Sequence, residues 1–262
     1  MQDATQTVGE QLRDWRQRRR MSQLSLALDA DISARHLSFV ETGRARPSRA
    51  MVLHLADCLA VPLRARNALL LAAGFAPAFP QRPLDDPALA AARQAIDQVL
   101  AGHEPYPALA VDRHWTMIAA NRAVGLLTDG VDPALLQPPV NALRVSLHPA
   151  GLAPRIRNLG EWRAHVFARL RQQIAASADP GLAALLAELE ALSPSGPGEA
   201  APPDRAAVVV PLRIATPAGE LALFGTVTVF GTPVDITLAE LAIEAFYPAD
   251  AASAALLRTL LA

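Results

Sequence analysis

MSQLSLALDADISARHLSFVE, residues 21–41, is the stretch that decides the fold of this chain. Ser22 and Ser33 each precede a run with helical spacing of apolar residues, and a serine hydroxyl there accepts a hydrogen bond from the first helical turn. Between the two predicted helices, only Asp31 and Ile32 remain for the connection. The stretch therefore predicts two short helices joined by a tight turn.

The small and apolar residues of this stretch have the spacing of a helix-turn-helix motif. Gln23, Ala27, Ile32, Leu37 and Val40 fit that pattern. Ala27 must be small because the two helices cross there, and the three larger apolar residues hold the second of them in place.

The spacing of apolar residues predicts further helices on both sides of the motif, over residues 8–19, 48–59 and 69–73. Ser48 is the expected cap of the helix over 48–59. Five short helices with tight connections predict a compact all-α domain over residues 1–75. A five-helix module that binds another protein is the alternative to a DNA-binding head.

Proline-rich segments divide the rest of the chain. Residues 76–87 hold four prolines in twelve positions and predict a linker, and residues 193–203 predict a second loop. Residues 88–262 then mix two kinds of pattern. Helices are expected at 88–101, 159–177, 182–192 and 251–261, and strands near 108–119 and at 207–214, 219–230 and 241–247. This order predicts a second, α+β domain.

The composition excludes several kinds of chemistry. All 24 basic residues are arginine, so Schiff-base lysines, phosphate-loop lysines and Ser-Lys dyads are ruled out. Cys58 is the single cysteine, the six histidines are scattered without metal-ligand spacing, and no hydrolase or dinucleotide-binding motif occurs. We therefore expect no enzyme activity, no metal and no cofactor.

Charge is distributed unevenly. Residues 1–75 carry 11 arginines against 7 acidic residues, whereas residues 76–262 carry 13 arginines against 18. The arginines are densest at 13–20 and 44–49, which favours a polyanionic partner for the first domain alone. Arginine-rich coding in a high-GC genome is the alternative explanation. No signal peptide or membrane-spanning run is visible, so a cytoplasmic protein without membrane contact is expected.

The first domain resembles the XRE/Cro repressor family in residues 11–16, 21–23, 32–41 and 42–48. The resemblance implies that the helix after Ser33 enters the major groove and that the protein binds a near-palindromic double-stranded operator as a homodimer. It places Gln23, Ala34, Arg35 and Phe39 at the DNA. Arg35 is the expected base reader and Ser38 an added polar contact, while Arg44, Arg46 and Arg49 are expected to hold phosphates.

Two further expectations follow from the same resemblance. Arg16 and Glu41 match a family ion pair that joins two helices. Arg20 and Asp31 stand where the family usually has glycine, and a left-handed backbone at a non-glycine residue costs about 1–2 kcal/mol. Asp tolerates this conformation better than Arg, so we expect the usual turn at Asp31 and a different helix end at Arg20.

The second domain resembles the ligand-binding domain of MmyB-like transcription regulators, a PAS-like fold, in residues 102–109, 111–115, 120–122, 141–149, 151–158 and 230–235. The resemblance implies a pocket for a small amphipathic ligand of the fatty acid type. The expected polar groups are Asn121, Arg144 and His148, and the expected walls are Tyr106, Trp115, Trp162, Val166, Phe230 and Phe246. The alternatives are structural: an acid partner for Arg144, a turn cap at His148, and core packing for the aromatic residues.

The sequence thus predicts a two-domain protein with an all-α helix-turn-helix head, a linker and an α+β PAS-like sensor. The predicted function is ligand-responsive transcription regulation. An antitoxin-like protein, whose second domain binds a protein partner, and a small enzyme tethered to DNA are the competing hypotheses.

Overall fold

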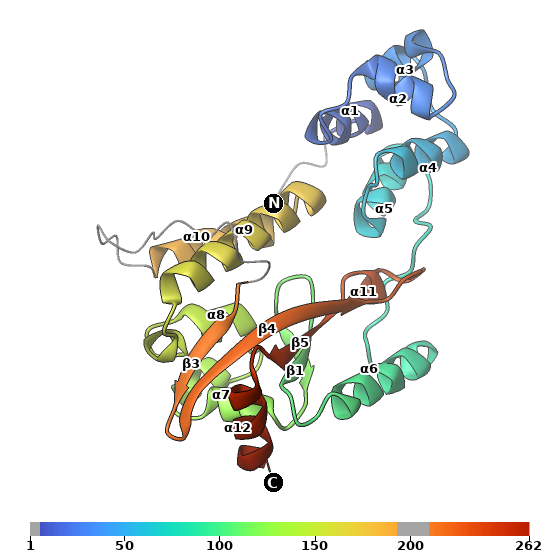
Figure 1. Ribbon diagram of the computed structural model, residues 1–262. Coiled ribbons are helices and arrows are strands. Elements are labelled where there is room, and N and C mark those ends of the chain that lie inside the picture. Colours follow the sequence, from blue (N-terminus) through green and yellow to red (C-terminus); the bar gives the residue numbers. More distant parts are fainter. Residues whose placement is uncertain (1–5, 193–209, 262) are drawn as a thin grey trace. The chain divides into compact units, whose positions relative to one another are not determined.

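The computed structural model describes residues 6–192 and 210–261 (Figure 1). Its contacts divide the chain into two compact units. The main division falls between Gln81 and Arg82, within the proline-rich stretch, and the short segments 175–177 and 234–236 are grouped with the first unit.

Five helices make up the head, residues 6–81: α1 (Val8–Arg18), α2 (Gln23–Asp29), α3 (Ala34–Glu41), α4 (Arg49–Cys58) and α5 (Leu63–Ala72). Thr7, Ser22, Ser33 and Ser48 cap the first four by accepting hydrogen bonds from backbone N–H groups. α5 starts at Leu63, earlier than expected, directly after Pro62. Leucines from all five helices are fully buried between them, among them Leu12, Leu26, Leu37, Leu55 and Leu69.

Both non-glycine turns of the head adopt the left-handed backbone. Arg20 has φ 55° and Asp31 has φ 51°. After α1, the Met21 N–H donates to the Arg16 carbonyl at 3.1 Å, and after α2 the Ile32 N–H donates to the Ala27 carbonyl at 2.9 Å. These are Schellman motifs, which satisfy the last carbonyls of each helix. The backbone bonds offset the local strain, so Arg20 ends α1 in the way a glycine would.

The second unit contains a five-stranded sheet surrounded by helices (Figure 1). Its strands are β1 (Ala108–Val111), β2 (Met117–Ala120), β3 (Leu212–Thr216), β4 (Gly219–Val229) and β5 (Ala242–Pro248). Its longer helices are α6 (Ala90–Gly102), α9 (Leu159–Ser177), α10 (Pro180–Ala191) and α12 (Ala251–Leu261), and its shorter ones are η1 (Pro87–Leu89), α7 (Val124–Thr128), η2 (Pro133–Leu136), α8 (Ala142–Leu147), η3 (Ala153–Arg155) and α11 (Ile236–Ala239).

The strand order is β2-β1-β5-β4-β3, and every neighbouring pair is antiparallel. β3 and β4, which correspond to the strands expected at 207–214 and 219–230, form an antiparallel hairpin. The predicted strand at 207–214 is seen from Leu212, and its first residues, 207–209, lie outside the described ranges. The α+β expectation is confirmed.

Alternate side chains of β5 point to opposite faces of the sheet and pack against different helices. Ala242 and Phe246 pack with α7–α10 on one face, whereas Ile243 and Ala245 pack with Ile96 of α6 on the other. The first face carries the larger core, to which α9 contributes a stripe of Trp162, Val166 and Leu170 at four-residue spacing. This core contains a cavity.

Candidate functional site

α3 presents its polar side outward because its apolar residues anchor the other side. Leu37 and Val40 are buried in the head core, whereas Arg35 is exposed and Ala34 and Ser38 are half-buried. A short helix held by its cap and two buried side chains offers its outer face as a rigid unit.

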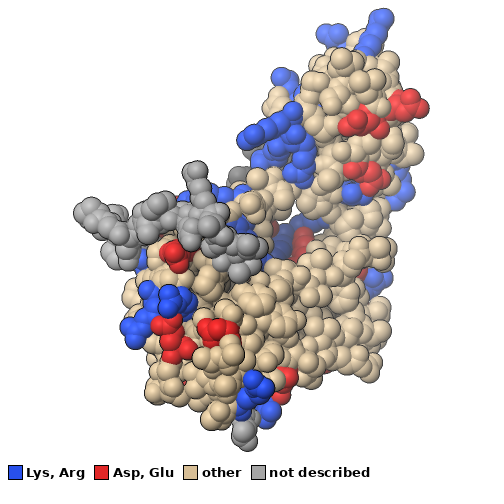
Figure 2. All heavy atoms as spheres, in the orientation of Figure 1, with Lys and Arg blue, Asp and Glu red and all other residues tan. Residues whose placement is uncertain are grey.

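An arginine of α3 and an arginine of the loop that follows it stack on one aromatic ring at the outer face of the helix. The Arg35 guanidinium lies 5.3 Å from the ring centre of Phe39, and that of Arg44 lies 5.9 Å from the same ring. Such cation–π contacts hold two flexible side chains over one half-buried ring. Arg46 and Arg49 are exposed just beyond, and Figure 2 shows arginines grouped on the surface of the head.

A buried carboxylate holds the three helices of the motif together. Glu41 accepts hydrogen bonds from Arg16 Nε at 2.6 Å, from Arg16 Nη2 at 2.8 Å and from Gln23 Nε2 at 2.7 Å. Burial alone would raise the pKa of Glu41, but these bonds outweigh it and lower the pKa. The expected ion pair is thus present, and Gln23 is engaged within the head.

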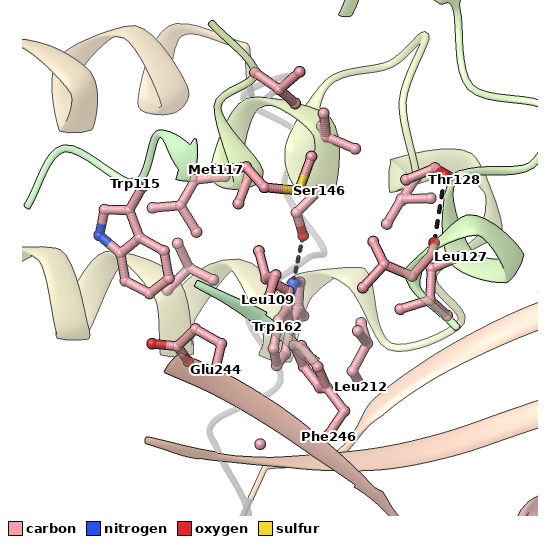
Figure 3. A pocket seen from close by; sticks show the side chains of 18 of the residues that line it. Leu109, Trp115, Met117, Leu127, Thr128, Ser146, Trp162, Leu212, Glu244 and Phe246 are labelled. Carbon is pink, nitrogen blue, oxygen red and sulfur yellow. Dashed lines mark hydrogen bonds between the residues drawn. The ribbon is translucent and has the colours of Figure 1, made fainter. Parts of the chain in front are cut away.

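The second unit encloses a cavity of about 340 Å³, within the range of about 300–1,000 Å³ of small-molecule sites. Trp115, Trp162 and Phe246 line it together with Val166 and Leu212. In Figure 3, Trp162 lies at the middle, with its Nε1 donating to the Ser146 hydroxyl at 2.9 Å. The walls are largely apolar and come from both α9 and the sheet.

The polar end of the cavity is built from α9 and β5. Arg169 donates from Nη1 to Glu244 Oε2 at 2.8 Å and from Nη2 to Oε1 at 2.5 Å. The same guanidinium lies 4.5 Å from the ring centre of Trp115, whose Nε1 donates to Gln173 Oε1 at 3.0 Å. All three of these groups, Arg169, Glu244 and Trp115, line the cavity.

His165 adds a neutral group beside this pair. Its ring stacks on Trp162, with centres 5.5 Å apart and planes 25° from parallel. Burial lowers the pKa of His165, and the nearby Arg169 guanidinium lowers it further. The imidazole is therefore uncharged at neutral pH and offers one donor and one acceptor.

Comparison with protein families identifies both units. A model of the MmyB-like transcription regulator ligand binding domain matches residues 92–260. The chain belongs to this family of MmyB-like regulators. A helix-turn-helix domain model matches residues 7–69, so the head is a DNA-binding domain. A comparison with curated proteins found no match.

These two matches describe a ligand-sensing transcription regulator. In the part of the chain that the structure describes, no helix is both long and apolar enough to cross a membrane. The described residues also contain no group of three or more acidic, histidine or cysteine side chains arranged for a metal ion.

The predicted ligand contacts fall into two sets, according to whether they line the cavity of the MmyB-like domain. Trp115, Trp162, Val166 and Phe246 line the cavity. The remaining five predicted contacts lie outside its lining: Tyr106, Asn121, Arg144, His148 and Phe230.

The polar residues of the second set have structural partners. Asn121 is buried and bonds the Leu100 and Tyr106 carbonyls and the Ala108 N–H. Arg144 forms a bidentate pair with Glu188 at 2.6 and 2.8 Å on the surface, and His148 Nδ1 accepts from the Ala150 N–H at 3.0 Å.

The apolar members of the second set pack elsewhere. Phe230 packs against the core on the α6 side of the sheet. Tyr106 packs at the edge of the larger core, near His103 and Tyr247.

Sequence reasoning missed Arg169 and Glu244, although both carried a detectable signal. Arg169 falls on the helical stripe of Trp162 and Val166, three residues beyond the latter. Glu244 shares the alternating face of Ala242 and Phe246. A charged residue on a buried stripe and another on a buried strand face each indicate a need for a buried partner, but the pattern does not show which residue that partner is.

Proposed function

We propose that this MmyB-like regulator binds a specific DNA operator with an affinity set by an amphipathic ligand in the second unit. The observation that carries the proposal is the cavity, which has apolar walls and one polar end in a chain that also has a helix-turn-helix head. A cavity of this kind buries an apolar chain and orients one polar head.

On the DNA side, Arg35 is proposed as the base-reading residue. Its guanidinium is exposed on α3 and steadied by Phe39, and such a fork pairs with two acceptors on the edge of guanine. Arg44, Arg46 and Arg49 supply phosphate contacts, which add affinity without sequence choice.

Ala34, Ser38 and Phe39 complete the proposed DNA-binding surface. Gln23 contributes by donating a hydrogen bond to Glu41, which holds α2 against α3.

We expect binding as a homodimer, with two recognition helices set about 34 Å apart on a near-palindrome. Selection of operators from random DNA by the full chain tests this arrangement. A selected near-palindrome with half-sites one helical turn apart supports it, and a single unrepeated half-site contradicts it.

For the ligand, the proposed class is an acyl compound of the fatty acid type. Native mass spectrometry of the purified full chain is the direct test, because a tightly bound acyl compound adds its own mass to the protein. Val166→Phe places an aromatic ring in the cavity. The ring occupies the space of the ligand, so this variant should not carry the added mass. Val99→Phe is the matched control, since Val99 is exposed on α6, outside the cavity.

The expected result is added mass on the wild type and on Val99→Phe, and none on Val166→Phe. Equal added mass on all three proteins would place the ligand elsewhere. Absence of added mass on the wild type, together with failure of added acyl compounds to bind, contradicts the ligand part of the proposal.

A further inference from the structure

The polar end of the cavity already contains two opposite charges that satisfy each other. Arg169 and Glu244 are joined by two hydrogen bonds of 2.8 and 2.5 Å. The side chain of Glu244 is 7% exposed and that of Arg169 is 26% exposed. With His165 uncharged, the polar end carries no net charge to offer an ion.

A ligand carboxylate meets an obstacle at such a site. If Arg169 keeps Glu244, the ligand brings a second negative charge beside the first, and like charges at one site disfavour ionisation. If Arg169 moves to the ligand, Glu244 is left as a buried carboxylate without its partner, which is strongly unfavourable. The surface arginine that the sequence offered for a carboxylate, Arg144, lies outside the cavity and pairs with Glu188.

An uncharged head meets a complementary group instead. His165 lines the cavity, and no residue of the described ranges forms a hydrogen bond with its ring nitrogens. Its stacking on Trp162 fixes the ring plane. A hydroxyl, ester or amide can pair with one of these nitrogens without disturbing Arg169 and Glu244.

We infer that the cavity selects a long-chain amphiphile with an uncharged polar head over the free carboxylate of the same chain length, and that His165 receives the head. The inference rests on the proposed function, because it specifies the ligand of that same cavity. It replaces the fatty acid itself with long-chain alcohols, esters or amides as the preferred ligands.

Titration of the full chain with decanol and with decanoate tests the inference, followed by the fluorescence of Trp115 and Trp162. At about pH 8, where decanoate is ionised, decanol should bind the wild type at least about tenfold more tightly. An alcohol enters any apolar cavity more readily than an ion does. The wild-type preference for decanol is therefore not specific to this polar end, and variants of the polar residues are needed to test their role.

Glu244→Gln removes the internal negative charge and leaves Arg169 available, so decanoate affinity should rise about tenfold while decanol affinity changes little. His165→Phe keeps a ring on Trp162 but removes both nitrogens, so decanol affinity should fall. Arg144→Ala is the control, and it should leave both affinities unchanged.

Calorimetry of decanoate binding in two buffers of different ionisation enthalpy gives a second measurement that needs no variant. The wild type should take up about one proton per decanoate bound, because the charge at the polar end must be cancelled. Decanoate binding without proton uptake, or as tight as decanol binding, overturns the inference. So does Glu244→Gln with unchanged decanoate affinity. Failure of both probes to bind overturns the proposed function itself.

Discussion

Arg16 on α1 and Glu41 at the end of α3 share two hydrogen bonds, of 2.6 and 2.8 Å, inside the head. The Glu41 side chain is 1% exposed, and its Oε2 also accepts from Gln23 at the start of α2. One carboxylate therefore fixes the recognition helix to both of its neighbours.

Arg16→Leu should lower the free energy of unfolding of the head by about 3–5 kcal/mol, because Glu41 would stay buried without its cation. Urea denaturation of the full chain, followed by circular dichroism, measures the effect. In the double variant Arg16→Leu/Glu41→Leu, most of the loss should be recovered. A loss below about 1 kcal/mol for the single variant would show that the pair is dispensable.

The same pair predicts how acid affects the head. Because the folded pKa of Glu41 lies below its unfolded value of about 4.3, this carboxylate stabilises the fold above that pH. Its contribution should be lost as the pH falls through the folded pKa. Urea midpoints measured from neutral to acid pH should fall less steeply for the Arg16→Leu/Glu41→Leu variant, and equal slopes would argue against the assignment.

Gly9 on α1 marks the closest approach to α3. A Cβ at this position would lie 2.3 Å from the Val40 carbonyl oxygen and 2.8 Å from that of Glu41. These are backbone atoms, so Gly9→Ala should force the helices apart and cost about 1–3 kcal/mol. Gly125→Ala in α7 meets nothing within 4 Å and should be neutral or stabilising. Thermal unfolding measures the effect. If Gly9→Ala and Gly125→Ala both have the melting temperature of the wild type, α1 does not approach α3 as closely as this packing requires.

Local patterns predicted the head almost completely. Ser22, Ser33 and Ser48 are read from the sequence as caps, and they cap helices in the structure. The left-handed turn at Asp31 agrees with the prediction, whereas the glycine-like end of α1 at Arg20 differs from the altered helix end that the sequence predicts there. These features depend on residues within one helical turn of each other.

The cavity was predicted only in part, because its polar end is a long-range pairing. The helical stripe on α9 gave Trp162 and Val166, but Arg169 and Glu244 lie 75 positions apart in the sequence. An arginine on a helix is ordinarily a solvated residue, and its partner is visible only once β5 lies against α9. Local motifs favour Arg144 instead, and in the structure Arg144 pairs with Glu188 outside the cavity lining.

Arg35→Ala should remove operator preference while leaving weak general DNA binding, since a bidentate base contact is worth about 1–3 kcal/mol. Arg46→Ala should weaken binding to all sequences alike and reduce the salt slope by about one. Fluorescence anisotropy with the selected operator and with random DNA at several salt concentrations separates these effects. An equal loss on both DNAs for Arg35→Ala would refute its base-reading role.

Coupling between cavity and operator is the central claim, and it is tested by the operator affinity of the full chain with and without a saturating amphiphile. We predict a change of at least about fivefold with decanol for the wild type and for Val99→Phe, in either direction. Val166→Phe, with its cavity filled, should show no change. An operator affinity that stays the same while decanol occupies the wild-type cavity would contradict the account.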